Sequence, residues 1–95
     1  MEAAKYDPRW LVELALQQFP GEPWLAAALE KCTTIVDRDG EILFFVDRME
    51  GKFKQNVNLL DPTKGRVVLD LLVDGRVGAL EILGTPFAPD SFEIN

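Results

Sequence analysis

Two Asp-Gly dipeptides, at residues 39–40 and 74–75, constrain the fold of this chain more than any other feature. Each dipeptide lies between two segments rich in apolar residues. Asp-Gly provides the positive φ angles that a tight turn between antiparallel strands requires. The sequence therefore predicts two β-hairpins, one joining strands over 33–38 and 41–48 and the other joining strands over 66–73 and 76–83.

A two-residue loop of Asp74 and Gly75 fixes which side chains of the second hairpin share a face. The predicted pairs are Val73–Arg76, Leu72–Val77, Leu71–Gly78, Asp70–Ala79, Leu69–Leu80, Val68–Glu81 and Val67–Ile82. Asp70 and Glu81 then lie diagonally on the face opposite the apolar pairs. Gly78 falls on the apolar side, where we expect it to admit a close neighbour or to mark a bulge.

The first hairpin is predicted with Asp39 and Gly40 as its loop. The resulting pairs are Arg38–Glu41, Val36–Leu43 and Ile35–Phe44, and a three-residue loop with a bulge would shift them by one. The segment "LFFV" over 43–46 is apolar on both faces. This strand is therefore expected either to be covered on both sides or to present one apolar face to a partner.

Residues 52–60 alternate between apolar and polar, which predicts a further strand with one wet face. Phe53, Val57 and Leu59 are expected on its apolar side. Before residue 33 the period is instead helical. Asp7 and Pro8 are start signals for a helix over 8–19.

The first predicted helix has Leu11, Leu14, Ala15 and Gln18 on one face. A second helix over 23–32 starts near Pro23 and ends its apolar stripe at Cys32, which is expected to be a small core residue. The chain is thus predicted to be a single α+β domain over 1–95. Two N-terminal helices would pack on a mostly antiparallel five-stranded sheet, connected as a meander and followed by an extended tail over 84–95.

The composition excludes several classes of site. The chain has no histidine and one cysteine, so it lacks Ser-His and Cys-His catalytic pairs and imidazole metal ligands. We expect no cofactor and no metal. The net charge of −6 disfavours nucleic acid and favours a basic protein partner, although solubility alone also explains it. No signal peptide or membrane-spanning run is apparent, so a cytoplasmic location without a membrane partner is expected.

The closing segment carries a family resemblance. Phe53, "NVNLL", Gly65 and "VVLDLLVDGRVGALEIL" follow one another within 53–83. This segment resembles the closing half of small immunity proteins of bacterial contact-dependent growth inhibition systems, with Ala79 in place of a glycine and Ile82 in place of a phenylalanine. The part "DGRVGALEIL" is also similar to the short strand pairs of widespread uncharacterised bacterial domains.

The resemblance implies a non-enzymatic protein that binds and neutralises a cognate toxin, often a basic nuclease domain at the toxin's C-terminus. The candidate toxin-binding residues are Asp39, Glu41, Asp70, Leu72, Asp74, Val77 and Glu81. One alternative is a small enzyme or metal-dependent hydrolase that uses Asp70 and Glu81, with Asp74 as an optional third carboxylate. Another is an oligomeric scaffold in which the "LFFV" strand pairs with a second copy.

Overall fold

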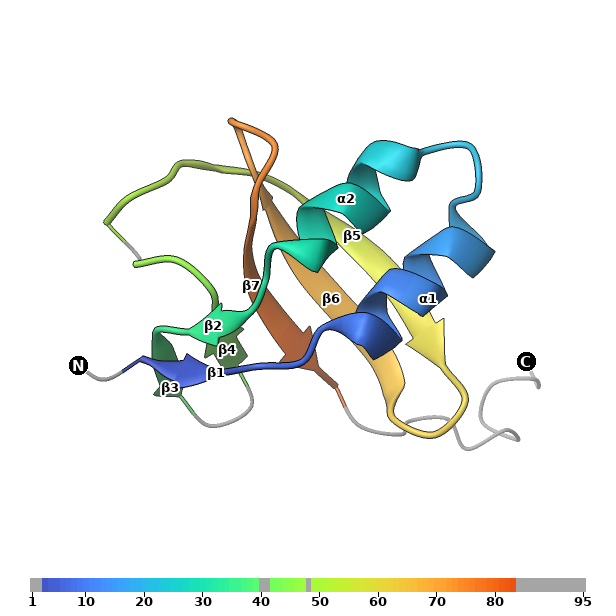
Figure 1. Ribbon diagram of the computed structural model, residues 1–95, viewed down its shortest axis with the longest axis horizontal. Coiled ribbons are helices and arrows are strands. Elements are labelled where there is room, and N and C mark those ends of the chain that lie inside the picture. The colour runs from blue at the N-terminus through green and yellow to red at the C-terminus, as the bar shows by residue number, and fades with distance from the viewer. Residues whose placement is uncertain (1–2, 40–41, 48, 84–95) are drawn as a thin grey trace.

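The computed structural model describes residues 3–39, 42–47 and 49–83. Two helices, α1 (Arg9–Gln18) and α2 (Pro23–Glu30), lie side by side over one face of a sheet (Figure 1). The predicted α+β class and both N-terminal helices are confirmed, with each helix end within two residues of its expected position. The predicted extended tail over 84–95 lies outside the described residues.

The strands form two antiparallel sheets, so the prediction of one five-stranded sheet is wrong. A small sheet pairs β1 (Ala4–Lys5) with β2 (Thr34–Ile35). The larger sheet has the order β3-β4-β7-β6-β5, with β3 at Asp37–Asp39, β4 at Ile42–Phe44, β5 at Phe53–Asp61, β6 at Gly65–Leu72 and β7 at Val77–Ile82. The predicted strand over 33–38 is divided between the two sheets because β1 pairs with its first half.

The order of the larger sheet differs from a simple meander. Strand β4 pairs with β7, the last strand, whereas β5 pairs only with β6 and lies at the edge. Residues 45–52 therefore connect β4 to a strand on the far side of β7 and β6. This connection brings the two halves of the chain into one sheet.

The core lies between the helices and the inner face of the larger sheet. Its fully buried large side chains are Leu11, Leu25, Leu29, Leu59, Val67, Leu69 and Leu80. On α1, residues Leu11, Leu14 and Ala15 are buried as the helical period predicts. Removal of this apolar surface from water is the main stabilising contribution in a domain of this size.

The second hairpin has the predicted strand register but not the predicted turn. Leu72 N–H donates to Arg76 O at 2.8 Å and Gly75 N–H donates to Leu72 O at 3.0 Å, which closes a loop of three residues. Gly75 has a φ of 91°, which this kind of loop requires at its last position. The loop is thus one residue longer than the predicted two-residue loop.

A bulge at Gly78 takes up the additional residue of the turn. Leu71 pairs with Val77, and Asp70 pairs with Ala79, so Gly78 is left without a partner position on β6. From there on, the predicted pairs Asp70–Ala79, Leu69–Leu80, Val68–Glu81 and Val67–Ile82 are confirmed. The predicted pair of Leu71 with Gly78 is wrong, while the expectation of a bulge at Gly78 is confirmed.

The first hairpin is offset by one residue on each strand from the predicted register. Its observed pairs are Asp37–Phe44, Arg38–Leu43 and Asp39–Ile42. Asp39 therefore belongs to β3 rather than to the loop. Arg38 pairs with Leu43, so its predicted pair with Glu41 is wrong; Glu41 itself lies outside the described residues.

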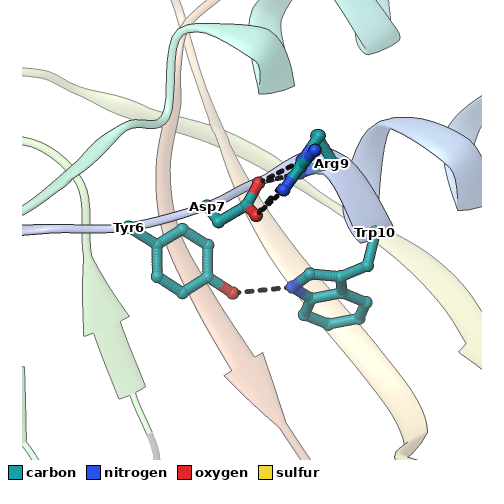
Figure 2. A network of polar contacts seen from close by, with 4 residues as sticks. All are labelled: Tyr6, Asp7, Arg9 and Trp10. Atoms are coloured by element: carbon teal, nitrogen blue, oxygen red, sulfur yellow. Dashed lines mark hydrogen bonds and ion pairs between the residues drawn. The ribbon is translucent and has the colours of Figure 1, made fainter.

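The entry into α1 is fixed by hydrogen bonds within two residue pairs, Asp7–Arg9 and Tyr6–Trp10 (Figure 2). Asp7 Oδ1 accepts the backbone N–H of Arg9 at 3.1 Å, and Asp7 Oδ2 accepts Arg9 Nη2 at 2.7 Å. Pro8, not Asp7, occupies the N-cap position, so the helix begins one residue later than predicted. Trp10 Nε1 donates to the Tyr6 hydroxyl at 3.0 Å, and the Tyr6 ring lies 5.4 Å from that of Phe45.

Candidate functional site

The face of the larger sheet that points away from the helices is the candidate site. We call it the outer face and define it by Ile42, Phe44, Val68, Asp70, Ala79 and Glu81. These residues alternate along their strands with inner side chains such as Leu43, Leu69 and Leu80, which contact the core. All six except Ala79 are partly exposed.

Cross-strand pairing arranges the outer face in two rows. One row runs through Ile42, Glu81, Val68 and Asn58, and the other through Phe44, Ala79, Asp70 and Asn56. Each row therefore carries one carboxylate among apolar side chains of β4, β7 and β6, and ends at an asparagine of β5. Asp70 and Glu81 are diagonal neighbours, as predicted, and such neighbours lie about 7–8 Å apart.

Asp70 is held in place by the edge strand. Asn56 Nδ2 donates to Asp70 Oδ1 at 2.7 Å and also to the backbone O of Leu69 at 3.3 Å. The hydrogen bond fixes the orientation of the carboxylate. Within the described part of the chain, no lysine or arginine forms a salt bridge with Asp70.

A hollow of about 150 Å³ lies beside Asp70. Its lining residues are Phe44, Val46, Asp47, Gly51, Phe53, Asp70, Leu72, Gly78 and Ala79. The small residues Gly78 and Ala79 of β7 leave the space between strands that carry the larger Phe44 and Phe53. Asp47 contributes a second carboxylate, whose Oδ1 accepts the backbone N–H of Met49 at 2.9 Å.

Leu72 and Val77 were predicted to form contact area on the outer face. Leu72 does lie on that face, but it is only 6% exposed because Gly51 and Gly78 pack against it. The prediction for Val77 is wrong: its side chain is 2% exposed and belongs to the core. The three-residue turn pairs Val77 with Leu71, whose side chain faces inward.

The alternation of residues 52–60 predicts Phe53 on the core-facing side of its strand, and this prediction is wrong. Phe53 pairs with Leu72 and Gln55 with Leu71, so a bulge at Lys54 reverses the alternation of β5. Val57 and Leu59 face the core as predicted, whereas Phe53 is 57% exposed and lines the hollow on the outer face. No pattern in the sequence marks this bulge.

The candidate residues of the two turns are not part of this arrangement. Asp74 accepts Arg76 Nε at 2.8 Å and the Arg76 backbone N–H at 3.0 Å. The backbone N–H and then the guanidinium of Arg76 hold the pKa of Asp74 below its usual value. This carboxylate is therefore neutralised within the chain. Asp39 lies on β3 through its backbone, and Glu41 is outside the described residues.

A second cavity, of about 300 Å³, lies between α2 and the start of β7. Trp24, Cys32, Phe45 and Arg76 are among its lining residues. Arg76 is already engaged by Asp74 and lies 3.8 Å from Glu50. Cys32 is 4% exposed, as expected for a core residue, and burial raises the pKa of its thiol to about 12. This cavity therefore offers neither a reactive thiol nor an unpaired guanidinium.

Three further findings bear on the class of site. Within residues 3–39, 42–47 and 49–83, no group of three His, Cys, Asp or Glu side chains is arranged to hold a metal ion. Neither α1 nor α2, the helices of the described part of the chain, has the length and apolar character needed to cross a bilayer. Comparison with protein-family models, curated proteins and solved structures finds no match to this chain.

Proposed function

We propose that this chain is an immunity protein, which binds and neutralises a basic toxin domain through its outer face. The observation that carries the proposal is the placement of Asp70 and Glu81 among half-buried apolar side chains of that face. Interfaces of this kind combine a few apolar anchors with complementary charge. The net charge of −6 would further accelerate encounter with a basic partner.

The geometry favours binding over the two alternatives. In the hydrolase alternative, the optional third carboxylate, Asp74, lies at the turn of the hairpin and pairs with Arg76. A scaffold built by pairing β4 with a second copy would need a free edge. Strand β4 is instead hydrogen-bonded to β3 on one side and to β7 on the other.

The test is binding to the product of the neighbouring gene, which this proposal predicts to encode a toxin. The full chain would be co-purified with the toxin domain, and the dissociation constant measured by calorimetry. Reversal of both outer-face charges, Asp70→Lys with Glu81→Lys, is expected to weaken binding by about a hundredfold or more while the unfolding midpoint changes little.

The matched control reverses two exposed carboxylates on the helices, Glu13→Lys with Glu30→Lys. This control makes the same change in net charge, so it should reduce the affinity much less. Absence of any complex would refute the immunity function. Equal losses in both double variants would instead refute the outer face as the binding surface.

A further inference from the structure

The hollow beside Asp70 has the chemistry of a pocket for a single cationic side chain. Its floor is apolar, because Leu72, Gly78 and Ala79 form it. One aromatic side chain, Phe53, is 57% exposed and comes from the edge strand β5 at one side of this floor. Two carboxylates, Asp47 and Asp70, also belong to the lining.

The volume of the hollow limits what can enter. A space of about 150 Å³ is comparable to cavities that hold one benzene-sized group. It is large enough for the end of one long side chain and too small for a strand or a helix. The hollow therefore admits one side chain of a partner but no backbone segment.

We infer that this hollow binds the guanidinium group of one arginine of the basic partner, an inference that rests on the proposed immunity function. A guanidinium is planar, so it can stack on the exposed ring of Phe53 while its N–H groups donate to a carboxylate. The Asn56 hydrogen bond orients Asp70 for such a pair. A lysine ammonium is more strongly hydrated and lacks the planar surface, so it fits this lining less well.

The inference is tested without a toxin by NMR titration of the full ¹⁵N-labelled chain. The probes are three peptides, acetyl-Gly-X-Gly-amide with X as arginine, citrulline or lysine. Citrulline retains the shape of arginine but has no charge. The arginine peptide is expected to give saturable shifts at the amides of Gly51, Leu72, Gly78 and Ala79, and to bind at least about tenfold more tightly than the citrulline peptide.

A variant in the hollow and a matched control locate the binding. Asp70→Asn removes the charge while keeping the shape, so it should weaken binding of the arginine peptide by about tenfold. Glu13→Gln makes the same change in charge on the exposed surface of α1 and should leave the affinity unchanged. A fully charged lysine peptide that binds as tightly as arginine would overturn the assignment to a guanidinium.

Two results separate this inference from the proposed function. If the toxin binds and the outer-face reversals weaken it, but the arginine peptide gives no saturable shifts at tens of millimolar, the hollow is not an arginine pocket and the immunity function stands. If the arginine peptide binds in the hollow but no toxin is captured, the immunity function fails while the pocket chemistry is supported.

Discussion

The side chain of Gln18 is hydrogen-bonded to both backbone groups of Leu60. Gln18 Nε2 donates to Leu60 O at 2.7 Å, and Leu60 N–H donates to Gln18 Oε1 at 2.9 Å. Leu60 lies on β5, the edge strand of the larger sheet. The amide of Gln18 therefore takes the place that a neighbouring strand would have, and it fixes the end of α1 to the sheet.

We predict that Gln18→Ala lowers the free energy of unfolding by about 1–2 kcal/mol. Two hydrogen bonds are lost, and water replaces Gln18 as the partner of the Leu60 backbone groups. The neighbouring exposed Gln17 provides the control, since Gln17→Ala should change stability by less than about 0.5 kcal/mol. Urea unfolding followed by tryptophan fluorescence measures both. Equal effects of the two substitutions would show that the contact contributes no stability.

Gly78→Ala is expected to destabilise the fold by about 1–3 kcal/mol through overpacking. A Cβ at this position would lie 3.0 Å from Leu72 Cδ2, and a Cβ at Gly51 would lie 2.6 Å from Leu72 Cδ1. Leu72 thus has little room to move away from either glycine. Gly21→Ala, where a Cβ meets nothing within 4 Å, is the control and should be nearly neutral.

Leu72→Ala should partly relieve the cost of Gly78→Ala. In a double-mutant cycle measured by chemical denaturation, the combined loss is expected to be smaller than the sum of the single losses. Strict additivity would mean that contact with Leu72 is not the reason for glycine at position 78.

The Asp7–Arg9 pair predicts a stability change in acid. Hydrogen bonds from the Arg9 side chain and then from its backbone N–H lower the pKa of Asp7 from 3.8 to about 2. The ionised form therefore stabilises the folded state above pH 4, and this contribution is lost as the pH falls from about 4 to about 2. The difference in unfolding free energy between the wild type and Asp7→Asn should narrow over that interval. A constant difference between pH 4 and pH 2 would contradict the prediction.

Cys32 is predicted to be unreactive in the folded protein. Burial raises its thiol pKa from 9.0 to about 12, so the reactive thiolate is rare at pH 8. Modification by a disulfide reagent at pH 8 should be at least about a hundredfold slower in buffer than in denaturing urea. A small cysteine amide measured in both solvents corrects for the effect of urea on the reagent. Similar protein rates in the two solvents would contradict the buried placement.

The register of β6 and β7 could be predicted because Asp74-Gly75 locates the turn, and because a one-residue slip would put Val67 and Leu69 on the opposite face from Leu80 and Ile82. The length of the turn could not be predicted, since Asp-Gly serves both two-residue and three-residue loops. Strand β1 was missed for another reason: Ala4 and Lys5 are too few residues to show a period.

The candidate site could also be predicted only in part. Asp70 and Glu81 follow from the alternation of their strands. Asp47 and Phe53 were missed because the connection over 45–52 has no period and the bulge at Lys54 has no marker in the sequence. The hollow is lined by Asp47, Phe53 and Asp70 together, so it could not be predicted without the structure.

The three-residue turn and the bulge at Gly78 also bear on how the chain avoids misfolding. A hairpin with only one of these irregularities would be shifted by one residue beyond position 78, and Glu81 would then face the core opposite Val67 or Leu69. Burial of an unpaired carboxylate costs several kcal/mol, so the shifted hairpin is strongly disfavoured. Glu81 therefore favours the observed pairing of β6 and β7 over the shifted one, whatever it contacts in a complex.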